Sequence, residues 1–459
     1  MKSIQLTIIA SILFIGSILP ANSQAIRPSQ LYRNYIDFLN RSHNLDSVVI
    51  YHKMILANPS FAENPLLDIL FKNAILEEVL KIRDNDLTAE RKIKREFLNS
   101  IFLRLEKEQV TESLPLILWV KAANTSSIPT LKSITAKFIE LASNQSNYYK
   151  NLVGRYGVAT YQIIKQEPEL TDLAKKLKAV LVDNLKANQI PYEKATSREI
   201  EYRRANYRYL YAYMCYDNAT SSTDLKEKQY FLKNASDYSP DVTDLDNSIA
   251  FMTDMKLLKG KKSFKYDYVD FLTNELPNKT DALNIMVQLA IQFADSKEPL
   301  KQFYEKIKTS NKSFEEFWFE EVEKYGRETP EILLETLLNS PKNLKTELDK
   351  KWVMIDFWGT WCGPCISEHP ELQKFYDSVA NSGEISLITV ACKDTEDKVL
   401  KYLQENRYTF PVVMADEKIE DDFQITSFPS KILITPNRKF ILIPHYMKLQ
   451  EGLKHYSNL

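Results

Sequence analysis

Glycine, cysteine and net charge are all scarce in this chain of 459 residues. It contains nine glycines and four cysteines, and 60 basic residues balance 61 acidic ones. Four cysteines are too few for the disulfide scaffold that stabilises many exported proteins. The near-neutral charge gives no electrostatic reason to expect a nucleic-acid or anionic-membrane partner. With 44% hydrophobic and 26% charged residues, the chain is typical of a globular protein of two to four domains.

Long apolar runs are absent after the first 23 residues. That first segment combines Lys2, an apolar run over residues 4–19, and small residues at Ala21 and Ser23. This pattern predicts a secretory signal peptide at residues 1–23, and the alternative is an uncleaved anchor. No cysteine nearby offers a site for lipid attachment. We therefore expect an exported protein located in the periplasm, without a membrane span after signal cleavage.

The distribution of glycine separates a long first region from the rest of the chain. Between residues 24 and 325 the only glycines are Gly154, Gly157 and Gly260. Apolar residues recur there every three or four positions, as over residues 66–80 and 170–181. We predict a mostly helical region of unassigned role at residues 24–328, in one or two subdomains. A helical-repeat solenoid is the alternative, although no fixed repeat period stands out.

One part of this helical region is rich in tyrosine. On a helix, four tyrosines share one face and two more share another: Tyr202, Tyr209, Tyr213 and Tyr216, then Tyr207 and Tyr211. The favoured interpretation is packing between helices. The alternative is a surface that holds a client protein, because tyrosine combines a large contact area with one polar tip.

From about residue 330 the chain alternates between short apolar runs and amphipathic segments. Strands are predicted at residues 352–358, 384–391, 410–414, 431–435 and 439–443, and helices at residues 365–378, 397–405 and 447–456. Strands that alternate with helices indicate an α/β layer structure. The chain is therefore predicted to be multi-domain, with a mostly α-helical N-terminal region followed by an α/β domain at residues 329–459.

Two of the four cysteines, Cys362 and Cys365, form a C-x-x-C motif between a predicted strand and a predicted helix. The strand delivers Cys362 to the start of the helix, where backbone N–H groups and the helix dipole favour a thiolate. The three-residue spacing puts both sulfurs on one face, close enough to bond. Pro364 restricts the first turn without removing a needed N–H group. This combination predicts a redox dithiol.

A zinc site is the alternative interpretation of a C-x-x-C motif. His369 and Cys392 could be imagined as its further ligands, but the surrounding Trp, Gly and Pro residues already explain the cysteine pair. We therefore expect no metal. Cys392 and Cys215 are interpreted as small buried apolar residues, with a second redox role as the alternative. His369 is predicted to be a solvent-facing helix residue.

The string Phe-Trp-Gly-Thr-Trp-Cys-Gly-Pro-Cys at residues 357–365 resembles the exported thiol–disulfide oxidoreductases of bacteria. These are thioredoxin-fold proteins related to the cytochrome-c-maturation reductases, and the resemblance covers residues 330–459, about a quarter of the chain. It implies a thioredoxin fold and dithiol–disulfide exchange through Cys362 and Cys365, without an organic cofactor. It also implies that Trp361, Gly363 and Pro364 contribute to the surface that binds the substrate.

The segment Ser427-Phe428-Pro429-Ser430 matches the cis-proline loop of the same family. The resemblance implies that Pro429 is cis and contacts the two cysteines, and that the backbone before it pairs with the substrate. Phe428 would line that surface, and it differs from the small or β-branched residue common there. The alternative is an ordinary trans proline at the edge of a strand.

An acidic residue, Asp356, lies six residues before Cys362 on a strand that is otherwise apolar. Burying a carboxylate there is costly. The resemblance implies that Asp356 lies under the disulfide and exchanges a proton with Cys365, at a pKa raised by burial. The alternative is an acid at the strand end that reaches solvent. Asp394 competes with two nearby acids for a second acidic role, and a solvated loop is the favoured interpretation there.

These patterns together predict an exported enzyme, a thiol–disulfide oxidoreductase. The Gly-Pro dipeptide between the cysteines resembles that of the reducing members, which favours a reductase of disulfides in client proteins. By analogy with the family, its electrons would come from a membrane-embedded donor. The alternative is a helical client-binding or adaptor protein with an accessory thioredoxin domain. The client, the oligomeric state, and the choice between reduction, oxidation and isomerisation stay open at this point.

Overall fold

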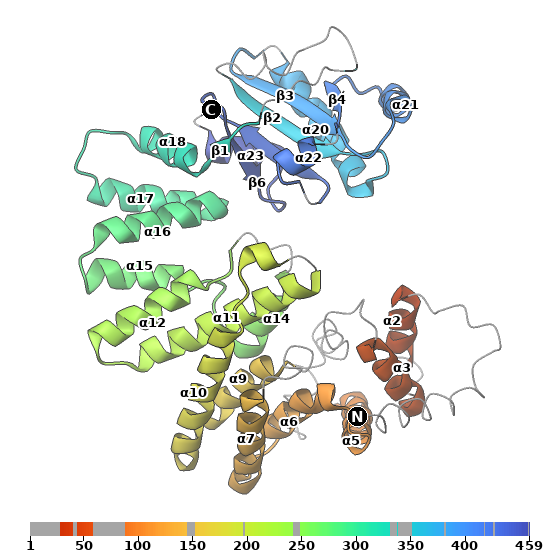
Figure 1. The fold of residues 1–459 in the computed structure, drawn as a ribbon, viewed down its shortest axis with the longest axis vertical. Coiled ribbons are helices and arrows are strands. Elements are labelled where there is room, and N and C mark those ends of the chain that lie inside the picture. Colours follow the sequence, from red (N-terminus) through yellow and green to blue (C-terminus); the bar gives the residue numbers. More distant parts are fainter. Residues whose placement is uncertain are drawn as a thin grey trace, which may run out of the picture. The chain divides into compact units, whose positions relative to one another are not determined.

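The computed structural model describes residues 28–39, 44–57, 88–144, 152–195, 198–241, 248–330, 337, 351–380, 382–416, 418–425, 427–457 and 459. The expected signal peptide and the periodic pattern at residues 66–80 lie outside these described residues. The chain divides into two compact units, Met1–Phe264 and Lys265–Leu459 (Figure 1). Across the described residues, none of the helices combines the length and the apolar character needed to cross a membrane.

The described part of the first unit is helical, which confirms the predicted fold class for this region. Its α-helices are α2 (Pro28–Asp37), α3 (Leu45–Ala57), α5 (Ala89–Lys107), α6 (Leu114–Ala123), α7 (Ile128–Ser143), α9 (Val153–Ile164), α10 (Thr171–Ala187), α11 (Arg198–Ser221), α12 (Leu225–Asp237) and α14 (Ser248–Leu258). Short 3₁₀ helices occur at Thr111–Ser113, Pro168–Leu170 and Tyr192–Lys194.

Helix α9 lies in the core of this unit, because nearly all of its residues are buried. A Cβ atom at Gly157 would lie 2.8 Å from Cδ2 of Leu181, so glycine permits the close approach of α9 and α10. The fully buried Arg155 of α9 forms an ion pair with Asp254 of α14. The amide of Asn206 in α11 donates to the same carboxylate at 2.7 Å. A buried charge that is paired in this way ties the three helices together.

The tyrosines of α11 pack against neighbouring helices. Tyr202, Tyr207, Tyr209 and Tyr211 are all buried. The ring of Tyr211 packs edge-on against Tyr238 at 4.8 Å between centroids. The packing interpretation is thus confirmed for these four residues, whose side chains are not available to hold a client.

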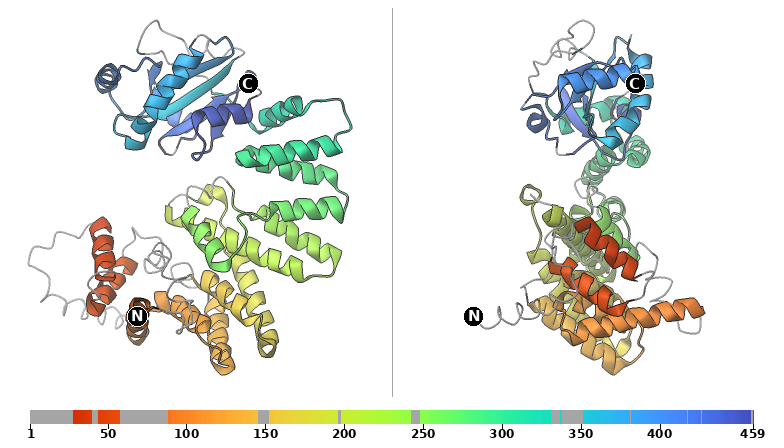
Figure 2. Two further views of the ribbon diagram at one scale, coloured as in Figure 1. Left: turned by 180° about the vertical axis from the view of Figure 1, so that it is seen from behind. Right: turned by 90° about the vertical axis from the view of Figure 1, so that its right-hand side faces the viewer.

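A six-stranded sheet forms the centre of the second unit (Figures 1 and 2). Its strands are β1 (Arg327–Glu328), β2 (Trp352–Trp358), β3 (Ile385–Ala391), β4 (Val412–Met414), β5 (Ser430–Ile434) and β6 (Lys439–Ile443). Their order across the sheet is β1-β6-β5-β2-β3-β4. Strands β2, β3 and β4 are parallel, whereas β5 is antiparallel to both β2 and β6.

The strands are accompanied by helices α20 (Gly363–Val379), α21 (Glu396–Asn406), α22 (Ile419–Asp422) and α23 (Leu449–Tyr456). All five strands and three helices predicted after residue 350 are present, with ends that differ by at most two residues. Strand β1 and helix α22 escaped prediction because they are very short. The predicted α/β architecture is therefore confirmed for this part of the chain.

Side chains of β2 alternate between the two faces of the sheet. Phe357 points toward α22 and packs against Phe423, with ring centroids 5.8 Å apart. Trp358 points to the opposite face, where His369 of α20 packs edge-on against it at 4.5 Å. Asp356 shares the face of Trp358, because the two are separated by two positions. The register of the strand thus directs a carboxyl group toward α20.

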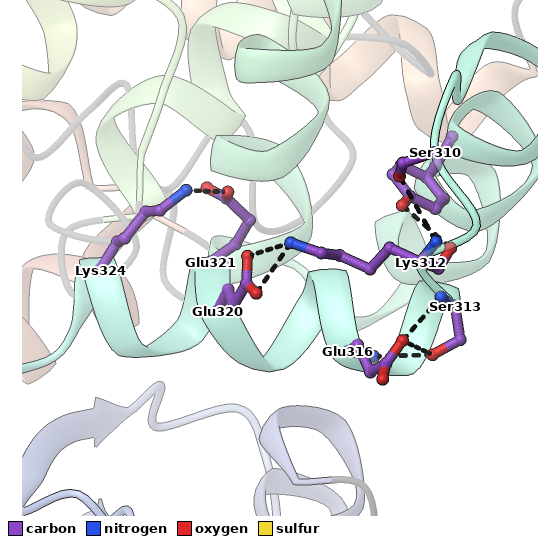
Figure 3. Close-up of polar contacts among 8 residues, drawn as sticks. Ser310, Lys312, Ser313, Glu316, Glu320, Glu321 and Lys324 are labelled. Carbon is purple, nitrogen blue, oxygen red and sulfur yellow. Dashed lines mark hydrogen bonds and ion pairs between the residues drawn. The ribbon is translucent and has the colours of Figure 1, made fainter.

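Four helices precede the sheet within the second unit: α15 (Lys265–Asn274), α16 (Lys279–Gln292), α17 (Lys297–Ile307) and α18 (Phe314–Tyr325), with a 3₁₀ turn at Ala294–Ser296. Figure 2 shows them in green, stacked side by side in chain order. Helix α18 begins at a capping box in which Ser313 and Glu316 exchange backbone–side-chain hydrogen bonds (Figure 3). The neighbouring Lys312 pairs with Glu320 at 2.7 Å on the same helix surface.

Side chains that hydrogen-bond to backbone carbonyls near helix ends join these helices to α23. The last turn of α16 offers backbone carbonyls to His455, at 2.7 Å, and to Tyr456, also at 2.7 Å. In return, the indole N–H of Trp318 in α18 donates to the carbonyl of His455 at 2.8 Å. The last carbonyls of a helix have no hydrogen-bond partner within the helix, and these side chains supply one. The second compact unit, Lys265–Leu459, thus contains these four helices together with the sheet.

Candidate active site

Cys362 and Cys365 lie at the junction of β2 and α20, and a disulfide joins them with their Cα atoms 5.3 Å apart. Cys362 is the N-cap residue of α20, and its sulfur accepts a hydrogen bond from the backbone N–H of Cys365 at 3.3 Å. Cys362 is 5% exposed and Cys365 is 1% exposed. An incoming group can thus reach only the edge of Cys362, and the helix N-terminus favours negative charge on that same sulfur.

The loop before Cys362 is fixed by its own side chains. The indole N–H of Trp361 donates to the carbonyl of Cys392 at 3.0 Å, while the ring remains 52% exposed. A Cβ atom at position 359 would collide with that indole, which explains Gly359. Trp361 is therefore held in one orientation although half of its surface faces solvent.

Asp394 also holds this loop. Its Oδ2 accepts the backbone N–H of Thr360 at 2.7 Å, and its Oδ1 accepts that of Thr395 at 3.0 Å. Partial burial opposes ionisation, but these hydrogen bonds outweigh it and keep the pKa of Asp394 below its usual value. Asp394 lies in a largely exposed loop, and its carboxylate also accepts a hydrogen bond from the loop that leads to Cys362.

The peptide bond between Phe428 and Pro429 is cis, as the resemblance implied. The Phe428 ring packs edge-on against Trp361 at 5.3 Å, and the Lys393 ammonium lies 5.1 Å from the Phe428 ring centroid. Two more residues predicted to bind substrate, Gly363 and Pro364, are exposed. A Cβ atom at Gly363 would meet no atom within 4 Å. The residues predicted to bind substrate thus offer an accessible aromatic and apolar surface around Cys362.

Asp356 is only 3% exposed, which rules out the alternative of a strand-end acid that reaches solvent. Desolvation raises the pKa of Asp356 to about 7, against the opposing effect of Lys431 and with a smaller contribution from Glu368. Its Oδ1 is buried and has no hydrogen-bond partner among the described residues. A carboxyl group with a pKa near neutrality can both accept and return a proton at physiological pH.

Two neighbours of Asp356 were missed by the sequence analysis. Lys431 of β5 lies directly opposite Asp356 in the strand register and is only 8% exposed. Its ammonium pairs with Glu368 of α20 at 2.7 Å. The available signal was a lysine at the start of an otherwise apolar strand, but only the register shows which residue it faces.

The remaining cysteines and His369 lie in the interior. Cys215 and Cys392 are buried, as predicted, and burial raises the pKa of each thiol to about 12. The expectation of a solvent-facing His369 is wrong: it is fully buried, burial lowers its pKa to about 4, and its Nδ1 lies 2.9 Å from the hydroxyl of Tyr402. Within the described ranges there is no cluster of three or more His, Cys, Asp or Glu residues that could hold a metal ion.

The fold and the cysteine pair define a thioredoxin-like thiol–disulfide oxidoreductase domain. Residues 349–440 match the sequence model of the family described as thioredoxin-like. Over 135 residues the chain is 27% identical to the thiol-disulfide oxidoreductase ResA of Bacillus subtilis (strain 168). That alignment covers 29% of this chain and 74% of the relative.

A second relative, the thiol-disulfide oxidoreductase ResA of Oceanobacillus iheyensis, is 33% identical over 114 residues. The chain spans 59% of that relative's length, and the alignment covers 25% of this chain. Among solved structures, StoA from Bacillus subtilis matches at 22% identity and a TM-score of 0.25, over 27% of this chain and 94% of that one. All three matches leave most of this chain uncovered.

Proposed function

We propose that this protein is an exported thiol–disulfide oxidoreductase that reduces disulfide bonds in client proteins. The observation that carries the proposal is the unequal environment of the two sulfurs. Cys362 caps a helix and has an accessible edge, while Cys365 is buried on the sheet face that also carries Asp356. The buried Oδ1 of Asp356 has no hydrogen-bond partner in the described part of the chain. This asymmetry suits an attacking cysteine followed by a resolving one.

The proposed reaction begins with the reduced pair. The Cys362 thiolate attacks one sulfur of a client disulfide, and a mixed disulfide forms while the other client sulfur leaves as a thiolate. Cys365 then gives its proton to Asp356 and attacks the sulfur of Cys362. The Cys362–Cys365 disulfide forms, the second client sulfur leaves, and the two client thiolates take up protons from water. The client gains two electrons and the cysteine pair loses two.

The proposed client-binding surface consists of Trp361, Gly363, Pro364, Phe428 and Pro429. Its support is the exposed tryptophan ring, the aromatic pair that it forms with Phe428, and the open space at Gly363. Aromatic rings provide large contact area to an extended segment with little loss of side-chain entropy. No organic cofactor or metal takes part in this scheme.

The direction of electron flow and the location are also parts of the proposal. The Gly-Pro dipeptide in the motif supports reduction, and the signal-like residues 1–23 support export to the periplasm. An exported reductase needs a source of electrons, which we propose to be a membrane-embedded donor. A reduction potential near the thioredoxin value of about −270 mV would agree with a reductase, whereas one near about −120 mV would indicate an oxidant.

The test of the redox reaction uses the full chain without residues 1–23 and a disulfide-bonded peptide. Cys365→Ser should accumulate a covalent mixed disulfide with the peptide, and Cys362→Ser should not react. If Cys362→Ser reduces the peptide at the wild-type rate, the proposed reaction is refuted. Cys392→Ser is the matched control, because that thiol is buried and should leave the rate unchanged.

A second candidate function is a helical client-binding or adaptor protein with an accessory redox domain. The observation in its favour is the helical first unit, which ends at Phe264 and is separate from the unit that carries the cysteines. A comparison of the full chain with residues 265–459 would distinguish the two. Equal rates toward a peptide but lower binding of folded clients by the shorter chain would favour the adaptor.

A further inference from the structure

The cross-strand neighbour of Asp356 is a buried lysine. Asp356 of β2 and Lys431 of β5 are directly opposite in an antiparallel pair, so both side chains project from the same face of the sheet. Helix α20 covers this face. The Lys431 side chain is only 9% exposed. A cation is rarely buried without a partner, because its desolvation is costly.

The ammonium group of Lys431 pairs with Glu368 and not with Asp356. It lies 2.7 Å from Oε2 of Glu368, which is three residues after Cys365 on α20 and has a half-exposed side chain. Asp356 keeps a buried Oδ1 without a hydrogen-bond partner among the described residues. Lys431 therefore acts on Asp356 through its charge alone, while Glu368 fixes the position of that charge.

We propose that Lys431 and Glu368 are a positioning pair that sets how tightly Asp356 holds the proton it exchanges with Cys365. This inference rests on the proposed function and adds two residues to it. The proton passes from the Cys365 thiol to the Asp356 carboxylate as Cys365 attacks the Cys362 sulfur. The positive charge of Lys431 stabilises the ionised Asp356, and the negative charge of Glu368 offsets part of that effect.

Charged and titratable groups approach Asp356 from each element packed against it. Strand β5 contributes Lys431 and α20 contributes Glu368, both of which act on the Asp356 charge. The disulfide lies at the start of α20. The buried thiol of Cys392 follows β3 and interacts weakly with the Asp356 charge. The burial of Asp356 is the largest cause of its raised pKa. Lys431 and Glu368 therefore adjust a pKa that desolvation has already moved toward neutrality.

The two members of the pair have opposite effects, which gives a sharp test. Lys431→Met should raise the pKa of Asp356 by about one unit, the usual size of a nearby opposite charge. Glu368→Gln should lower it, because the glutamate charge is removed and the lysine is free to turn toward Asp356. A merely structural role for the pair predicts no such opposite shifts. The readout is an infrared titration of the carboxyl band that is absent from Asp356→Asn, in the oxidised full chain.

The chain offers a matched control on the same helix. Glu371 of α20 pairs with Lys448 at 3.2 Å, but both side chains are 68% exposed. Solvent screens such pairs, so Glu371→Gln and Lys448→Met should leave the titration of Asp356 unchanged. Glu368→Gln keeps the test available if Lys431→Met fails to fold, because Glu368 lies half in solvent.

The pH profile of the reaction provides the second readout. In a single turnover of the reduced protein with a disulfide-bonded peptide, the rate should rise with pH through the pKa of Asp356. The midpoint should move up in Lys431→Met and down in Glu368→Gln. Absence of any shift, or shifts of the same sign in both variants, would overturn the inference. Such a failure leaves the activity of the wild type intact, whereas failure of the proposed function appears as an unaffected Cys362→Ser.

Discussion

The buried carboxyl group of Asp356 should make the stability of the second unit fall as pH rises. Burial raises its pKa from 3.8 to about 7 in the folded protein. Well below pH 4 the group is protonated in both the folded and the unfolded chain, so it contributes nothing to the pH dependence there. Between about pH 4 and pH 7 the folded state binds more protons than the unfolded state, and the free energy of unfolding decreases with pH.

The size of this effect follows from the two pKa values. Each unit of pKa difference corresponds to about 1.4 kcal/mol. The ionisation of this group should therefore lower the free energy of unfolding by about 4 kcal/mol by pH 8. The substitution Asp356→Asn removes the titration and keeps the shape of the side chain. The free energy of unfolding of the variant minus that of wild type should therefore increase by about 4 kcal/mol from pH 4 to pH 8. This increase does not depend on the stability of the variant at pH 4.

The assay is urea-induced unfolding of the oxidised protein at pH 4, 6 and 8, followed by tryptophan fluorescence. Four of the five tryptophans, at positions 318, 352, 358 and 361, lie in the second unit and dominate the signal. Only the difference between variant and wild type counts, because other groups also titrate. A difference that stays constant across this pH range would show that Asp356 is ionised in the folded state, and the reasoning would fail.

Asp394 provides a control of opposite sign. Hydrogen bonds from Thr360 and Thr395 lower its pKa despite partial burial, so its contribution to stability is present above the unfolded pKa and is lost as pH falls through the folded value. Asp394→Asn should therefore reduce stability at pH 8 and have progressively less effect toward pH 3. The two aspartates thus make opposite predictions in the same experiment.

Three further substitutions test other parts of the structure. Trp318→Phe removes the indole bond to the carbonyl of His455 and should lower the free energy of unfolding by about 1–3 kcal/mol in the same urea assay. Gly359→Ala forces a methyl group against the Trp361 indole and should cost about 1–3 kcal/mol, measured as a lower midpoint of thermal unfolding. Trp361→Ala should raise KM for a disulfide-bonded peptide while the equilibrium potential with glutathione changes little, because half of this ring faces solvent.

Features that depend on local sequence could be predicted. The strand at residues 352–358 is a continuous apolar run, and the helix after Cys362 starts at a cysteine followed by Gly-Pro, so both are visible in consecutive residues. The burial of Asp356 was implied by the resemblance, and its place in an otherwise apolar run agrees with it. The cis bond at Pro429 came from the resemblance alone.

Features that depend on partners distant in the chain could not be predicted. Lys431 faces Asp356 only because of the register between β2 and β5, which the sequence does not display. The burial of the polar residue His369 depends on Trp358 and Tyr402, which belong to other elements. The attachment of α16 and α18 to α23 uses backbone carbonyls, which are present at every residue and carry no sequence signal.

Removal of the Asp356 carboxyl group should change stability and reactivity in opposite directions. This contrast distinguishes a functional acid from a structural one. A structural acid is stabilised by its partners, so its removal lowers stability and leaves the chemistry unchanged. Asp356 has a buried oxygen without a partner among the residues that the structure describes, and its ionised form is costly at the pH where a dithiol works. Removal of such a group should increase stability at pH 8 and slow the attack by Cys365, because the thiol then loses its proton acceptor. A residue whose removal has both effects serves the reaction and not the fold.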